Sequence, residues 1–276
     1  MAGIVTTPIA SVQLYSLRDQ LAEDLEGSLD RLVQIGLTHV EAFGFVDRAP
    51  ALRAALDARG LVAPTGHAPL LSDELWTPYG TVPAPAPELV FEAAAVLGVS
   101  TVFEPFVDPA RWLTREGVDD IADRLNAAAE TAAGFGLTVG YHNHAQEFVA
   151  SFDGVSAYEY VIGRLDDRVA IELDLFWAET GGQDVPALTE RLGSRLTAVH
   201  VKDGAIPQNP WAPGSDLDPA DVHQTRPGEG AVQLVESLRS NDSVRYAVIE
   251  YDRAPGDVFD DVAASLAFLR SQGLAQ

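Results

Sequence analysis

The chain has 276 residues, of which 47% are hydrophobic, and a formal net charge of −23 at pH 7. It contains no cysteine, which excludes disulfides, thiolate metal sites and a cysteine nucleophile. The negative charge argues against binding to nucleic acid or to an anionic membrane surface, because both depend on basic patches.

No run of about 18 apolar residues occurs, so we expect no membrane-spanning segment. Residues 1–16 lack the basic region and the long apolar run of a signal peptide. We therefore expect a cytoplasmic protein.

One pattern recurs along the chain: a segment with helical apolar spacing, then a glycine, then a short apolar segment with the composition of a strand. Glycine is preferred where a helix ends in a left-handed residue. The glycines in this position are Gly36, Gly60, Gly98, Gly136 and Gly193. In chain order, the predicted strands are residues 11–16, 37–43, 61–67, 99–105, 137–144, 169–177, 194–203 and 246–252, and residues 257–273 form a last helix.

The predicted strands are apolar almost throughout, as in parallel strands that are covered on both faces. Eight strand–helix units without a linker predict a single domain over residues 1–276, folded as a (β/α)8 TIM barrel. The alternative is an open, doubly wound sheet, but residues 13–21 lack the phosphate-binding glycines expected after its first strand. The proline-rich residues 70–90 predict a loop over the pocket, with Trp76 and Tyr79 contacting the substrate or another subunit.

Ionisable residues lie at the ends of most of the predicted strands. In a barrel these ends converge on one mouth, where active sites lie. So many acidic and imidazole groups in one hollow require a cation to neutralise them. Oxygen and nitrogen donors without sulfur favour Mn²⁺, Mg²⁺ or Co²⁺, with Zn²⁺ as a further candidate. The residues are Glu41, His67, Glu104, His142, His144, Glu147, Glu172, Asp174, His200, Lys202, Glu250 and Asp252.

Five motifs occur in a characteristic order, and together they extend over most of the chain. The set resembles the sugar isomerase/epimerase superfamily with the xylose-isomerase-like barrel, and most of all its YHNH branch, which includes proteins that act on inososes and 3-keto-glycosides. The motifs are YHNHAQEF (141–148), ELDLFW (172–177), HVKDG (200–204), RPGEG (226–230) and VIEYD (248–252).

The resemblance implies one metal ion held by residues of strands five to eight. Asp174, His200 and Glu250 match the family's ligands directly. On strand five this chain has His142 where sugar epimerases have the ligand glutamate, so we assign the fourth ligand to Glu147, the nearest acid. His142 or His144 remains the alternative ligand.

The chemistry implied is the removal of a proton next to a carbonyl, with the metal stabilising the enediolate. His142 and His144 are the candidate bases, because imidazole titrates near neutral pH. Glu147 and Glu250 are candidates for the second acid or base, and Lys202, the chain's single lysine, for holding a substrate hydroxyl or the enolate oxygen.

Four further residues are candidates for substrate binding. His67 and Glu104 end predicted strands, Trp177 follows the sixth strand, and Arg226 matches a position that contacts substrate in the family. For Arg226 a surface ion pair is an equally good interpretation, and for Trp177 packing in the core is the alternative.

The predicted function is a divalent-metal-dependent isomerase or epimerase of a neutral sugar or keto-sugar. The alternative is a lyase or dehydratase that cleaves a 3-keto-glycoside or an inosose by β-elimination, with one histidine taking the proton and the other protonating the leaving oxygen. The predicted partner is a small sugar substrate, not nucleic acid or membrane, and a homo-oligomer or a second subunit remains open. An abasic-site endonuclease would need a basic groove, and a non-catalytic barrel would not need a complete ligand set.

Overall fold

The computed structural model describes residues 7–77 and 80–276. Its main sheet has eight strands in the order β1-β14-β11-β10-β7-β6-β3-β2. All neighbouring strands are parallel, and a parallel bridge from Gln13 to Glu41 joins the two edges, so the sheet closes into a barrel. The strands are β1 (Ile9–Val12), β2 (His39–Phe43), β3 (Val62–His67), β6 (Thr101–Glu104), β7 (Thr138–His142), β10 (Ala170–Asp174), β11 (Leu196–Val201) and β14 (Tyr246–Ile249).

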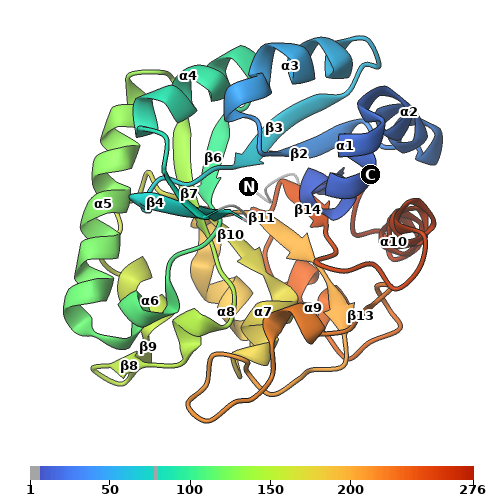
Figure 1. Cartoon of the computed structure of the whole chain (residues 1–276). Coiled ribbons are helices and arrows are strands. Elements are labelled where there is room, and N and C mark those ends of the chain that lie inside the picture. Colours follow the sequence, from blue (N-terminus) through green and yellow to red (C-terminus); the bar gives the residue numbers. More distant parts are fainter. Residues whose placement is uncertain (1–6, 78–79) are drawn as a thin grey trace, which may run out of the picture.

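The helices form an outer ring around these strands (Figure 1), which confirms the predicted (β/α)8 barrel. Gly36 and Gly98 cap α2 and α4 in the left-handed conformation, as the sequence predicts. No helix in the described part of the chain is long and apolar enough to cross a membrane. The helices are α1 (Arg18–Glu23), α2 (Leu25–Ile35), α3 (Ala49–Asp57), α4 (Pro87–Leu97), α5 (Arg115–Ala133), α6 (Ala157–Ile162), α7 (Leu175–Thr180), α8 (Val185–Leu192), α9 (Leu234–Arg239) and α10 (Val258–Ser271).

Several loops contain short hairpins or 3-10 helices. The predicted loop 70–90 contains an antiparallel hairpin and the start of α4. Tyr79 and the side chain of Trp76 lie outside the described residues, so their predicted contacts have no structural description. The hairpin strands are β4 (Glu74–Thr77) with β5 (Gly80–Pro83), β8 (Ser151–Phe152) with β9 (Val155–Ser156), and β12 (Asp203–Gly204) with β13 (Gln224–Thr225). The 3-10 helices are η1 (Leu14–Leu17), η2 (Val46–Arg48), η3 (Pro109–Leu113), η4 (Gln146–Phe148), η5 (Gly193–Arg195) and η6 (Pro219–Asp221).

The barrel interior is apolar at one level and polar at the next. Phe103, Ala170, Ala198 and Val248 are buried against one another as a separate apolar cluster. Because side chains alternate along a strand, the residue two positions further along points the same way. Two positions beyond Ala170, Ala198 and Val248 lie Glu172, His200 and Glu250, and on β7 His142 lies two positions beyond Gly140.

Gly140 makes room for the phenylalanine of this apolar level. A Cβ atom at Gly140 would overlap the Phe103 ring and lie 2.8 Å from the carbonyl oxygen of Ala170. We expect Gly140→Ala to lower the free energy of unfolding by about 2 kcal/mol, because overpacking forces the core to shift.

Urea unfolding followed by circular dichroism measures this change, and Gly163→Ala is the matched control. Gly163 has φ −67°, and an added Cβ would meet nothing closer than 3.6 Å. The control should leave the stability unchanged or raise it by up to about 1 kcal/mol. Equal stability of the two variants would contradict the packing described here.

Candidate metal and active site

Four side chains from neighbouring strands meet at the carboxyl end of the barrel. One ligand atom from each of His142, Asp174, His200 and Glu250 lies within 4.8 Å of the other three, and all four residues are buried. The sheet register produces this meeting, since Asp174 pairs with His200 across β10 and β11. Three of the four, Asp174, His200 and Glu250, are the ligands that the sequence predicted.

The donor atoms in this cluster suit a divalent ion. Asp174 Oδ1 accepts the Trp177 N–H at 2.9 Å, at the start of α7, while Oδ2 faces the Lys202 ammonium at 3.0 Å and has no other partner within the described residues. His142 Nδ1 lies 3.1 Å from Glu172 Oε2 and carries the proton, because a carboxylate only accepts. His142 Nε2 is thereby left with its lone pair, 4.0 Å from Asp174 Oδ2. The cluster thus offers two imidazoles and two carboxylates, and Glu172 orients the imidazole of His142. This donor set fits Mn²⁺, Co²⁺ or Zn²⁺.

A second polar network lies beneath the cluster and supports it. Glu41 Oε1 lies 2.7 Å from His200 Nε2 and accepts a hydrogen bond from Gln13 at 2.8 Å, and Glu172 Oε2 lies 2.6 Å from His67 Nε2. Burial tends to lower the pKa of His67, but Glu41 and Glu172 outweigh it and raise the pKa to about 9. The network therefore orients both imidazoles of the cluster from below.

Lys202 is buried among carboxylates. Its Nζ lies 2.7 Å from Glu250 Oε2, 3.0 Å from Asp174 Oδ2 and 3.0 Å from Asp252 Oδ2. Burial opposes its charge, but Asp174, Asp252 and Glu250 hold the pKa of Lys202 well above its ordinary value. The ammonium is thus enclosed by acids, and it is not among the groups that line the neighbouring hollow.

A hollow of about 240 Å³ opens above the cluster. None of its lining residues is arginine or lysine, and it combines carboxylates and imidazoles with aromatic walls. The polar lining consists of His67, His142, His144, Glu250 and Asp252, and the remainder is Tyr15, Phe43, Pro105 and Phe106.

His144 faces this hollow and is held by aromatic rings. Its ring centre lies 5.6 Å from Phe106, 5.9 Å from Trp177 and 6.1 Å from Trp211. Burial, with Lys202 nearby, lowers the pKa of His144 to about 3, so its imidazole is neutral. Trp177 is buried and packs behind His144, although the sequence suggested a substrate contact.

Glu147 lies apart from the cluster. Its carboxylate accepts hydrogen bonds from the Tyr141 hydroxyl at 2.6 Å and from the His144 N–H at 3.1 Å. Burial raises the pKa of Glu147 to about 7. Tyr141 points away from the barrel axis, because it alternates with His142 on β7, and Glu147 follows Tyr141. His142, which the sequence left as an alternative ligand, takes the place expected for Glu147.

Two further predicted substrate residues are engaged elsewhere. The Arg226 guanidinium pairs with Asp261 at 2.8 Å, outside the hollow, which matches the alternative interpretation of a surface ion pair. The Glu104 carboxylate is buried and fastens two loops to the barrel rim. It accepts the backbone N–H groups of Leu70, Leu71 and Phe106 at 2.6, 2.8 and 3.1 Å.

Sequence reasoning gave no role to several residues that shape the site. Glu41 was placed at a strand end without a function, whereas Gln13 and Trp211 carried no signal at all. Trp211 reaches His144 because Asn209 of the same loop donates a hydrogen bond to the Ala145 carbonyl at 2.8 Å. This hydrogen bond joins residues that are far apart in the chain, so no local sequence pattern could have indicated it.

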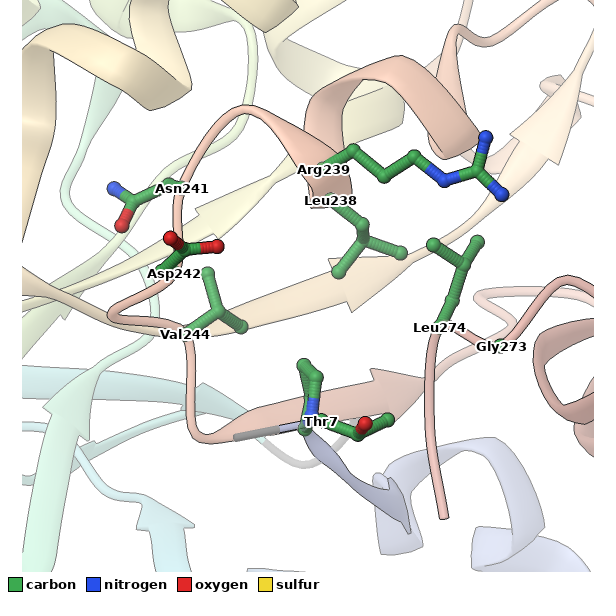
Figure 2. Close-up of a pocket in the computed structure, with 9 residues that line it drawn as sticks. Thr7, Leu238, Arg239, Asn241, Asp242, Val244, Gly273 and Leu274 are labelled. Carbon is green, nitrogen blue, oxygen red and sulfur yellow. The ribbon is translucent and has the colours of Figure 1, made fainter. Parts of the chain in front are cut away.

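A second hollow of about 140 Å³ lies at the opposite end of the barrel, beside the starts of β1 and β14 (Figure 2). Its charged lining residues are Arg239 and Asp242, and no histidine lines it. It therefore lacks the donor set found at the carboxyl end.

Comparison with solved structures finds the same fold in several proteins, including two that are named as sugar isomerases or epimerases. A sugar phosphate isomerase/epimerase from Parabacteroides distasonis has a TM-score of 0.76 and 21% identity, over 100% of this chain and 98% of that one. The 3-keto-D-glucoside 4-epimerase from E. coli has a TM-score of 0.67 and 18% identity, over 96% and 99%. The IolI protein, solved with a zinc atom, has a TM-score of 0.67 and 15% identity, over 96% and 98%.

A comparison with curated protein sequences finds no significant match. The family model described as "Xylose isomerase-like TIM barrel" matches residues 29–272, which includes every residue of the metal cluster. The chain therefore belongs to the xylose isomerase-like TIM barrel family.

Proposed function

We propose that this protein is a divalent-metal-dependent isomerase or epimerase of a neutral sugar or keto-sugar. The convergence of His142, Asp174, His200 and Glu250, of which His142 and Glu250 line the hollow, is the observation that carries the proposal. The sugar isomerases and epimerases among the structural neighbours support it.

His142, Asp174, His200 and Glu250 are the proposed ligands, with Mn²⁺ as the first candidate ion and Co²⁺, Zn²⁺ and Mg²⁺ behind it. The zinc atom in the IolI protein, which has the same fold, supports a divalent metal in this barrel. A bound ion would polarise a substrate carbonyl and lower the pKa of the adjacent C–H. Glu172 and Glu41 would hold the two imidazoles in place for it.

Proton transfer falls to groups that line the hollow. Burial tends to raise the pKa of Glu250, but Lys202 and His200 outweigh it and hold the pKa low, so its carboxylate stays ionised. Glu250 and neutral His144 are therefore the proposed acceptors. If the proton returns to the neighbouring carbon the result is isomerisation, and if it returns to the opposite face the result is epimerisation. Glu147 has its carboxylate turned to Tyr141 and is proposed only to position the His144 backbone.

The lining of the hollow supports a neutral substrate. A phosphate group would meet the carboxylates of Glu250 and Asp252 without an arginine or lysine to balance them, since Lys202 is already enclosed by acids. Tyr15, Phe43 and Phe106 offer aromatic faces to the apolar side of a sugar ring. A small neutral sugar is thus the proposed partner, and the acidic composition disfavours nucleic acid and anionic membranes.

A β-eliminating lyase or dehydratase is the second candidate. The observation in its favour is His144, an imidazole beside the cluster whose Nδ1 has no hydrogen-bond partner among the described residues. Neutral His144 would remove the proton next to the carbonyl, and the imidazolium so formed would give that proton to the leaving oxygen.

Replacing His142 and Glu147 in turn distinguishes the two possible ligand sets. We expect His142→Ala to bind Mn²⁺ at least about 10- to 100-fold more weakly, because the site loses a donor. Glu147→Gln should bind Mn²⁺ as the wild type does, because its carboxylate faces Tyr141. Isothermal titration of chelator-treated protein measures both, and the reverse pattern would return the ligand role to Glu147.

Isotope exchange tests the proposed chemistry. The protein with Mn²⁺ is incubated in D₂O with neutral ketoses and 3-keto-glycosides, and the products are followed by mass spectrometry and NMR. We expect deuterium on the carbon next to the carbonyl, and none in the Asp174→Asn variant. A product that keeps every substituent supports an isomerase or epimerase, and a product that has lost one supports the lyase. Turnover without deuterium would contradict both candidates.

A further inference from the structure

Lys202 poses a question that the proposed reaction does not answer. It is the chain's single lysine and is 1% exposed, and it does not line the hollow. Burying an ammonium group is costly unless partners offset the loss of water. Its partners are two of the proposed metal ligands and a third acid, Asp252.

We propose that Lys202 competes with the divalent ion for Asp174 and Glu250, and thereby lowers the affinity of the site for metal. The proposal rests on the metal site described above. The competing contacts are made by Asp174 Oδ2, which has no other hydrogen-bond partner among the described residues, and by Glu250 Oε2. An ion that binds these oxygens shares them with the ammonium, so two positive charges repel each other at short range with little water between them.

The same contacts assemble the site before an ion binds. Glu41, Glu172, Asp174 and Glu250 are all buried, at 0–5% exposure, and would repel one another without positive charge nearby. Lys202 supplies that charge to the two acids that the ion needs.

Asp252 gives the ammonium a partner that does not belong to the metal cluster. Both oxygens of Asp252 lie within 3.1 Å of Lys202 Nζ, and Gln224 donates a hydrogen bond to Asp252 Oδ2 at 2.7 Å. Lys202 can therefore remain paired with Asp252 while the ion takes Asp174 and Glu250. The divalent ion can therefore replace the ammonium at Asp174 and Glu250 while Lys202 keeps a negatively charged partner.

Metal titration of charge-removed variants tests the proposal without any substrate. Chelator-treated full-length wild type, Lys202→Met and Lys202→Gln are titrated with MnCl₂ and with ZnCl₂ by calorimetry. We expect both variants to bind at least about tenfold more tightly than the wild type, because one repelling charge is gone. Lys202→Gln keeps a donor to the acids and serves if Lys202→Met fails to fold.

Arg245→Met is the matched control, because it also removes one positive charge. Arg245 is exposed and lies just before β14, at the opposite end of the barrel. We expect its metal affinity to stay within about threefold of the wild type, since solvent screens a distant surface charge. If Arg245→Met binds the metal more tightly by the same factor as the Lys202 variants, the effect comes from net charge alone and the proposal is overturned.

Thermal melting gives a second measurement. Metal-free Lys202→Gln should melt at a lower temperature than the wild type, because its acids have lost their counter-charge, and should gain more from added Mn²⁺. If both Lys202 variants bind the metal as tightly as the wild type or more weakly, the proposed competition is wrong. The proposed metal site is not affected by that result. If neither the wild type nor a variant binds either ion, the proposed function itself fails.

Discussion

The upper half of this barrel is organised by negative charge that water cannot reach. Glu41, Glu172, Asp174 and Glu250 are buried together, and a buried carboxylate without compensation would cost several kcal/mol. Compensation comes from His67, His200 and Lys202, each of which lies within 3.2 Å of at least two of these acids. The pairing accounts for two features at once. It holds the donor atoms close enough to share an ion, and it leaves Glu41 Oε2, Glu172 Oε1 and Asp174 Oδ2 without a hydrogen-bond partner among the described residues.

The alternation of side chains along a strand explains why this charge gathers in one place. The apolar level of Phe103, Ala170, Ala198 and Val248 fills the barrel below. Two residues beyond the last three, the same strands present Glu172, His200 and Glu250 to the same axis. The next residues face the helices instead. Tyr141 is one of them, and it draws the Glu147 carboxylate to the outer side of the strand. Adjacent residues of β7 therefore have different roles: His142 faces the metal cluster, and Tyr141 holds Glu147, which supports a loop.

Sharing the fold with sugar isomerases and epimerases does not by itself settle the substrate, because one barrel supports many reactions. The distinguishing features of this chain lie at the rim. An imidazole replaces the expected glutamate at His142, a neutral histidine faces the hollow at His144, and no arginine or lysine lines the described hollow. These features are the basis for the proposed neutral substrate and for the proposed roles of His144 and Glu250.

The sequence by itself determined the barrel, the order of its strands, and the set of strand ends at which His142, Asp174, His200 and Glu250 occur. These follow from short-range periodicity and from the rule that parallel strand ends converge. Only the tertiary structure decided which group each long side chain meets. Glu104 accepts backbone N–H groups, Arg226 pairs with Asp261, Lys202 is enclosed by acids, and Trp211 packs on His144. Most of these partners lie more than thirty residues away along the chain, so local spacing holds no information about them, and the free energy of burying each charge selects the partner.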